Sequence, residues 1–131
     1  MPHLIIDKEI FPRDKICGDA LSGKVMPVLK KLDPSLIDEI SHDPDHFTGS
    51  YGIKFSAPNG KSIDIPFNKD LTSLKNPPGF ITRRIDFDAF LIKQIDPAIA
   101  DFRQGHELIS VVTDNDKKIL TIKNGAESYQ V

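Results

Sequence analysis

Two short segments of this 131-residue chain carry residue types that could do chemistry. In the first, Asp7 ends the apolar, strand-like run His3–Ile6 and is followed by a loop that contains Arg13. A carboxylate at the tip of a parallel strand can accept hydrogen bonds from ribose hydroxyls; an acid there is otherwise an ordinary solvated loop residue. The planar guanidinium of an arginine suits phosphate oxygens, and its other reading is a surface salt bridge. The second segment begins at Arg84, an arginine to which the same two readings apply.

Cysteine and histidine positions exclude several kinds of site. Cys17 is the only cysteine, so the chain has no internal disulfide and no zinc cage built on cysteines. A nucleophilic role for Cys17 needs a nearby base, which the sequence does not indicate; the alternative is a small buried apolar residue. The four histidines lack metal-ligand spacing, and we interpret the proline-containing segment from His42 to His46 as a solvated turn. We therefore predict no metal site.

The two segments together resemble a known family. The run Phe11-Pro12-Arg13-Asp14-Lys15-Ile16-Cys17-Gly18-Asp19, with Leu4-Ile5-Ile6-Asp7-Lys8 before it and Leu21-Ser22 after it, resembles FAD-dependent oxidoreductases of the geranylgeranyl reductase family. There, an acid-tipped strand precedes a PR-x-K-x-CG-[DE] loop and a helix. The run Arg84-Ile85-Asp86-Phe87-Asp88-Ala89-Phe90-Leu91 resembles the family's R-x-x-FD-x-x-L segment. The resemblance is loose between residues 42 and 78.

The resemblance implies five FAD-binding residues. Asp7 matches the acid that holds the adenosine ribose, and Arg13 matches the loop arginine near the diphosphate. Cys17 and Gly18 match the pair beside the flavin ring, where glycine allows close approach of the backbone. Arg84 matches a second arginine that opens a helix and faces the nucleotide.

The main phosphate-binding motifs of that family do not occur in this sequence. The family places a G-x-G-x-x-G turn about twenty-five to thirty residues before the acid, whereas six residues precede Asp7 here. A later GD-containing motif is also absent. We therefore expect an internal piece of a longer flavoprotein, which alone binds FAD weakly or not at all and has no turnover.

The composition limits the classes of protein to which this chain can belong. Seventeen Lys and Arg against nineteen Asp and Glu give a net charge of −2, which argues against nonspecific electrostatic binding of nucleic acid. No apolar run approaches the roughly 20 residues of a membrane span, and no secretory signal opens the chain. We expect a cytoplasmic protein without a transmembrane segment.

Hydrophobic periodicity predicts the elements that position these residues. After the first strand, a helix is expected over 21–32 with Leu21, Val25, Val28, Leu29 and Leu32 on one face, and Pro27 should kink or break it. A short helix follows from Pro34-Ser35 through Ile40. Alternating residues in 51–57 and 63–67 predict a hairpin around Pro58-Asn59-Gly60.

The second half of the chain shows the same kinds of pattern. A strand is expected over 79–83, then a helix with Asp86 as its N-cap. Strands over 108–113, 118–123 and 127–131 form a meander. The predicted fold is α+β: a partial, Rossmann-like FAD/NAD(P)-binding lobe over 1–42 and 86–131, which includes the meander, and an antiparallel hairpin region over 43–85 that belongs to a substrate-binding sheet.

Two functions of different classes follow. The first is a fragment of a flavin-dependent oxidoreductase whose full-length form passes hydride from a nicotinamide through FAD to an apolar small-molecule substrate. The apolar faces of the hairpin then either line the substrate pocket or form ordinary core. The second is a non-enzymatic, stand-alone module, derived from a flavoprotein, that binds partners or self-associates through exposed sheet edges.

Overall fold

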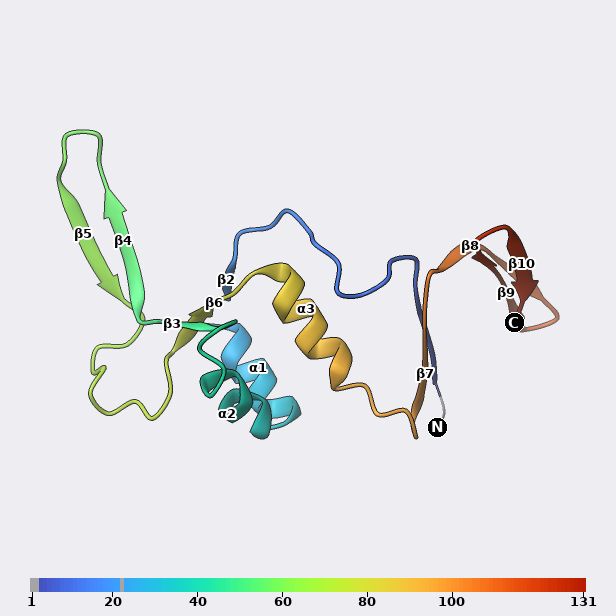
Figure 1. The fold of residues 1–131 in the computed structure, drawn as a ribbon, viewed down its shortest axis with the longest axis horizontal. Helices are drawn as coiled ribbons and strands as arrows, with labels where there is room; N and C mark the ends of the chain where they lie inside the picture. The colour runs from blue at the N-terminus through green and yellow to red at the C-terminus, as the bar shows by residue number, and fades with distance from the viewer. Residues whose placement is uncertain (1–2, 22) are drawn as a thin grey trace. The chain divides into compact units, whose positions relative to one another are not determined.

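A computed structural model describes residues 3–21 and 23–131, and Ser22 of the matched motif lies outside them. The chain forms two compact units: Met1–Lys15 with Phe87–Val131, and Ile16–Asp86. Three helices occur among ten strands in the described residues, and the strands form four small sheets of two or three strands. Figure 1 shows these elements along the chain. The predicted mixture of helices and strands is therefore confirmed. The assignment of 1–42 and 86–131 to a cofactor lobe and of 43–85 to a substrate sheet stays a prediction.

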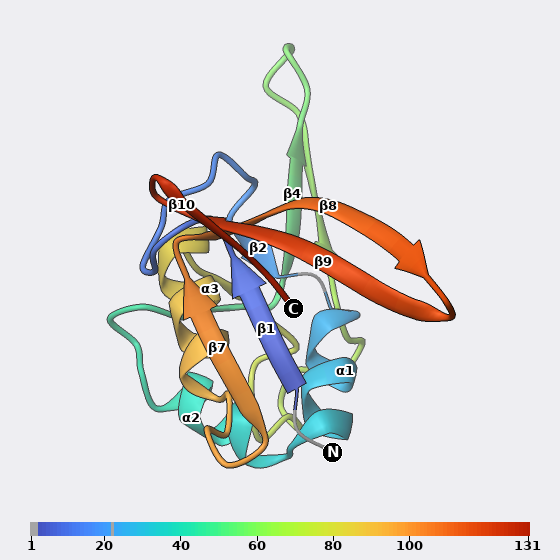
Figure 2. The same cartoon turned by 90° about the vertical axis from the view of Figure 1, so that its right-hand side faces the viewer.

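The first unit contains the only parallel pair among the described strands. Strand β1 (His3–Asp7) pairs in parallel with β7 (Ala100–Gln104), so that Asp7 lies opposite Gln104 at the carboxyl ends of both strands (Figure 2). The predicted meander follows as β8 (His106–Asp114), β9 (Lys117–Asn124) and β10 (Glu127–Gln130). Asn115 and Asp116 adopt positive φ in the β8–β9 turn, as the right-handed twist of a tight hairpin requires.

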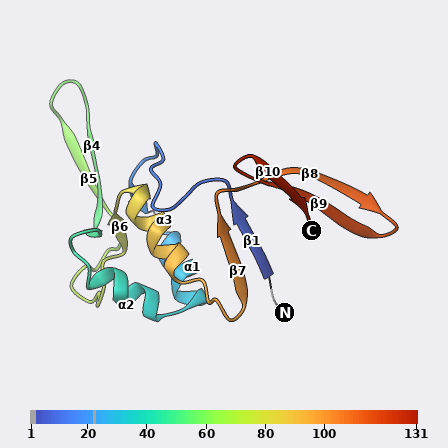
Figure 3. The same ribbon diagram turned by 45° about the vertical axis from the view of Figure 1, so that its right-hand side comes forward.

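The second unit packs two helices beside a three-stranded sheet. Helices α1 (Val25–Leu32) and α2 (Ser35–Ser41) lie next to each other (Figure 3). The sheet has the order β2 (Ala20–Leu21), β6 (Gly79–Ile81), β3 (Thr48–Ser50). The core of this unit consists of apolar side chains that are at most 8% exposed: Met26, Leu29, Leu36, Ile37, Ile40, Phe47 and Phe80.

The predicted hairpin is confirmed in the second unit. Strands β4 (Gly52–Ser56) and β5 (Ser62–Pro66) pair antiparallel, with Ile53 opposite Ile65 and Phe55 opposite Ile63. Gly60 in the turn has φ +80°, a conformation that costs glycine little because it has no Cβ.

Two helix starts differ from the sequence expectation. Helix α1 begins at Val25, because Leu21 belongs to β2, and Pro27 therefore lies in the first turn, where a missing N–H breaks no helical hydrogen bond. The expected apolar face of this helix is also wrong: Leu29 is buried with Met26, but Val28 and Leu32 are exposed.

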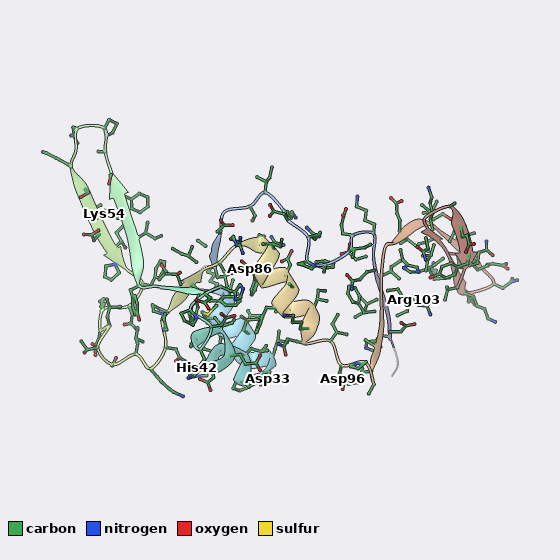
Figure 4. The ribbon with its side chains drawn as sticks, viewed as in Figure 1. Asp33, His42, Lys54, Asp86, Asp96 and Arg103 are labelled. Carbon is green, nitrogen blue, oxygen red and sulfur yellow. The ribbon has the colours of Figure 1, made fainter. Side chains whose placement is uncertain are left out.

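The third helix, α3 (Arg84–Lys93), begins two residues before Asp86, so that Asp86 is not its N-cap. Asp86 instead lies in the first turn (Figure 4), where it accepts two hydrogen bonds from Arg83, at 2.7 Å and 3.2 Å. A carboxylate in the first turn is stabilised by the helix dipole. The short strand β6 that precedes this helix ends at Ile81, two residues before the predicted end.

Candidate functional site

The carboxyl ends of β1 and β7 fix the start of the matched loop in the first unit. Asp7 ends β1, and its Oδ1 accepts a hydrogen bond of 2.9 Å from the Glu9 amide. The Gly105 amide donates to the Glu9 carbonyl at 3.2 Å, and the Phe11 amide donates to the Gln104 side chain. Ligands of parallel α/β sheets bind outside the carboxyl ends of the strands. Asp7 therefore lies at the carboxyl end of the parallel pair, and its role at the adenosine ribose stays a prediction.

Arg13 is held by contacts on both sides. Its guanidinium carbon lies 5.3 Å from the centroid of the Phe11 ring, and its Nη2 lies 3.8 Å from Oδ2 of Asp88. The Phe11 ring in turn lies 6.2 Å from that of Phe102 on β7. Aromatic and ionic contacts of this kind orient a guanidinium while its other N–H groups stay available.

One donor of Arg13 has no hydrogen-bond partner among the described residues. The Nε atom is buried and has no hydrogen-bond partner among residues 3–21 and 23–131. A buried N–H without an acceptor is costly, which makes it a candidate for a ligand contact. The role of Arg13 at the FAD diphosphate stays a prediction.

In the second unit, the end of the loop meets the start of α3. The Thr82 amide donates to the Asp19 carbonyl at 2.8 Å and so extends the β2–β6 pairing by one residue pair, beyond Ala20 and Ile81. This pairing brings Arg84 beside Cys17, and Nη1 of Arg84 donates to the Cys17 sulfur at 3.6 Å. Cys17 is exposed, so its alternative reading as a buried apolar residue is wrong.

Nothing in the described structure requires a glycine at position 18. Its φ is not among the positive values, and a Cβ built at Gly18 would meet no described heavy atom within 4 Å. The loop around it is exposed, including the apolar side chains of Ile10 and Ile16, which are 72% and 103% exposed. Long loops without regular structure are uncommon in compact domains and are usually functional.

Arg103 and His46 form polar contacts with residues outside the two matched motifs. Arg103 on β7 (Figure 4) binds Oδ2 of Asp101 at 2.7 Å and 2.9 Å and donates to the Tyr129 hydroxyl at 3.1 Å; hydrogen bonds to Asp101 and then to Tyr129 raise the pKa of Arg103. Nδ1 of His46 lies 2.9 Å from Asp43, and this hydrogen bond raises the His46 pKa above its ordinary value. In the part of the chain that the structure describes, no group of three or more His, Cys, Asp or Glu residues could hold a metal ion.

Sequence reasoning missed the residues that support the site, and it missed one cleft. Asp88 lies in the matched second motif but was not identified as the partner of Arg13, and Gln104 and Phe102 carried no local signal. The cleft, of about 620 Å³, lies in the second unit between α1, α2 and residues 74–78. The charge of Asp38 at the rim of this cleft is partly neutralised, because its carboxylate lies 3.5 Å from the Lys75 amine and accepts a hydrogen bond of 3.4 Å from Asn76.

Comparison with known proteins places the fold. No protein-family model matches the sequence. Conditioned medium factor receptor 1 of Dictyostelium discoideum is 29% identical over 123 residues, which are 90% of this chain and 23% of that protein. The chain therefore spans about a quarter of this curated relative.

Solved structures of flavoproteins resemble nearly the whole chain. A flavoprotein/dehydrogenase from Cytophaga hutchinsonii superposes with a TM-score of 0.77 at 17% identity, over all of this chain and 31% of that one. A myxobacterial chondrochloren halogenase, described as a variant of FAD-dependent halogenases, gives 0.75 at 21% identity, over 98% and 29%. A geranylgeranyl bacteriochlorophyll reductase-like protein from Thermoplasma acidophilum gives 0.66 at 20% identity, over 98% and 30%. The chain thus has the fold of part of an FAD-dependent flavoprotein.

No helix in the described ranges has the length and apolar character needed to cross a membrane.

Proposed function

We propose that this chain forms part of the FAD site of a flavin-dependent oxidoreductase similar to the geranylgeranyl reductases. The observation that carries the proposal is that the two matched motifs contact each other twice. Arg13 of the loop lies against Asp88 in the first unit, and Cys17 of the loop accepts from Arg84 in the second. Each contact lies within one unit and joins segments about 70 residues apart in sequence, and both involve residues that the resemblance assigns to FAD.

Each predicted residue then has a task that its chemistry suits. Asp7 accepts hydrogen bonds from the adenosine ribose, and Arg13 offers its guanidinium to the diphosphate. Cys17 and Gly18 let the loop backbone approach the flavin ring, and Arg84 orients the Cys17 side of the loop and faces the nucleotide. When bound, FAD supplies hydride transfer between a nicotinamide and an apolar substrate; the residues of this chain bind and orient it.

The chain on its own binds FAD weakly. The sequence contains no G-x-G-x-x-G turn, whose backbone N–H groups and helix dipole hold the pyrophosphate in dinucleotide folds. Each charge-assisted hydrogen bond that is missing costs about 1.5–3 kcal/mol. Tight binding and turnover accordingly need a glycine turn joined to the chain.

The test compares the chain with a version extended at its N-terminus by a strand–G-x-G-x-x-G–helix segment. FAD titration, followed by flavin fluorescence, is expected to give strong binding in the extended protein alone. In that protein, Gly18→Ala should weaken FAD binding about tenfold or more without lowering the melting temperature, since its Cβ would meet no described protein atom. Gly23→Ala is the matched control, because its Cβ makes an ordinary contact of 3.7 Å. Equal affinities for the two variants would contradict the proposal.

A second function, self-association as a non-enzymatic module, is favoured by a different observation. The apolar face of the β4–β5 hairpin is exposed to solvent in the second unit. This face does not depend on FAD.

A further inference from the structure

Two hydrogen bonds attach the start of the matched loop to the end of β7, a strand that lies outside both matched motifs. The Gly105 amide donates to the Glu9 carbonyl at 3.2 Å, and the Phe11 amide donates to the side-chain oxygen of Gln104. These two hydrogen bonds flank Ile10 and hold the chain on both sides of it. All of these residues belong to the first unit.

Of these two hydrogen bonds, only the one to Gln104 depends on a side chain. A backbone N–H can only donate, so the carbonyl oxygen of the Gln104 amide group faces Phe11. Gln104 ends β7 opposite Asp7, at the carboxyl ends of the parallel pair. Nδ1 of His106 lies 2.7 Å from the backbone carbonyl of Gln104, so that its main chain is held as well. Gln104 is therefore placed to fix Phe11.

The position of Phe11 determines where the guanidinium of Arg13 lies. The Phe11 ring packs at 6.2 Å from the Phe102 ring, and the guanidinium carbon of Arg13 lies 5.3 Å from the centroid of the Phe11 ring. A cation–π contact of this length orients the guanidinium over the ring. Oδ2 of Asp88 lies 3.8 Å from Nη2 of Arg13. A shift of Phe11 therefore moves one of the two surfaces between which the guanidinium is held.

We propose that Gln104 is a positioning residue that acts through Phe11 to hold Arg13 for binding of a phosphate group. The inference rests on the proposed FAD site, in which Arg13 offers its guanidinium to the diphosphate. A guanidinium that is already held in place loses less side-chain entropy when it binds an oxyanion, which lowers the cost of binding. Gln104 has no need to touch the phosphate, because its oxygen accepts from the Phe11 amide. Its effect on FAD affinity therefore depends on the presence of Arg13.

NMR of the chain itself tests whether Gln104 positions Arg13. The Nε–H of Arg13 is buried, which protects it from exchange with water, and the nearby Phe11 ring shifts its resonance. Gln104→Met keeps the length of the side chain but removes the acceptor, and it should move this resonance and speed up its exchange about fivefold. Gln130→Met is the matched control, because it makes the same change on β10 and should leave the resonance in place. Thermal unfolding checks that both variants are folded.

The affinity for FAD is then measured in the chain extended by the strand–G-x-G-x-x-G–helix segment. Arg13→Met should raise the dissociation constant about tenfold or more, and Gln104→Met should raise it about fivefold. In the Arg13→Met background, Gln104→Met should add less than about twofold, because no guanidinium is left to position.

These measurements separate the inference from the proposed function. Unchanged FAD affinity in Arg13→Met would overturn the proposed role of Arg13, and this inference with it. If Arg13→Met weakens binding and Gln104→Met does not, or if Gln104→Met weakens it equally in both backgrounds, only the positioning role of Gln104 is overturned. An unchanged Arg13 resonance in Gln104→Met would overturn that role without reference to FAD.

Discussion

The contact between Arg13 and Asp88 gives the sharpest test of how the loop is held. The two charged groups are 3.8 Å apart, and their side chains are 24% and 12% exposed. At this separation the direct attraction is about 1 kcal/mol in bulk water and about 4 kcal/mol at an effective dielectric constant of 20. Desolvation and lost side chain entropy oppose it. We expect a net coupling energy of about 1 kcal/mol.

A double-mutant cycle measures this coupling. Urea unfolding of the original chain, Arg13→Met, Asp88→Asn and the double variant gives the free energies of unfolding, and methionine keeps much of the apolar stem of Arg13. A loss of 1 kcal/mol corresponds to a fall in melting temperature of about 3–5 °C for a chain of this size.

The ion pair between Lys54 and Asp64 is the control for burial. Its separation of 3.7 Å is nearly the same, but its side chains are 63% and 74% exposed. Water screens such a pair, and its coupling should be about 0.3 kcal/mol. If the Arg13–Asp88 coupling were no larger than that of the exposed pair, the partly buried contact would not fix the loop and the argument would be refuted.

Further expected outcomes concern the second unit. Ile40→Ala removes a side chain that is 0% exposed and should lower the free energy of unfolding by about 3 kcal/mol, whereas Leu32→Ala, at 74% exposure, should cost less than about 1 kcal/mol in urea unfolding. Gly60→Ala forces a Cβ into φ +80° and should destabilise the hairpin by about 1 kcal/mol, measured by thermal unfolding. The pKa of His46, followed by NMR, should lie above 6.5 and fall in Asp43→Asn. The stability from this contact is complete below pH 6.5 and is lost as pH rises through the raised pKa.

Local patterns predicted much of the secondary structure. Alternation and turn residues located β4, β5 and the meander, because cross-strand spacing and positive φ leave a direct imprint on the sequence. Helix α2 was equally clear from Leu36, Ile37 and Ile40, which are buried on one side.

The element and the contacts that the sequence did not predict have a common physical cause. A two-residue strand such as β2 has no periodicity, so Leu21 was assigned to the helix and Pro27 was expected to bend it. The partners of the loop, Asp88 and Gln104, are more than 70 residues away in sequence, and such contacts depend on how the chain folds back. The matched motifs singled out Arg13, Cys17 and Arg84, but only the structure paired Arg13 with Asp88 and Cys17 with Arg84.

The most direct measurement of the central claim is amide hydrogen exchange of the N-terminally extended chain with and without FAD. The account predicts that FAD slows exchange in residues 7–19 and 84–88, where Asp7, Arg13, Cys17, Gly18 and Arg84 contact it. Bound FAD that leaves exchange in both segments unchanged, while protecting other parts of this chain, would contradict it.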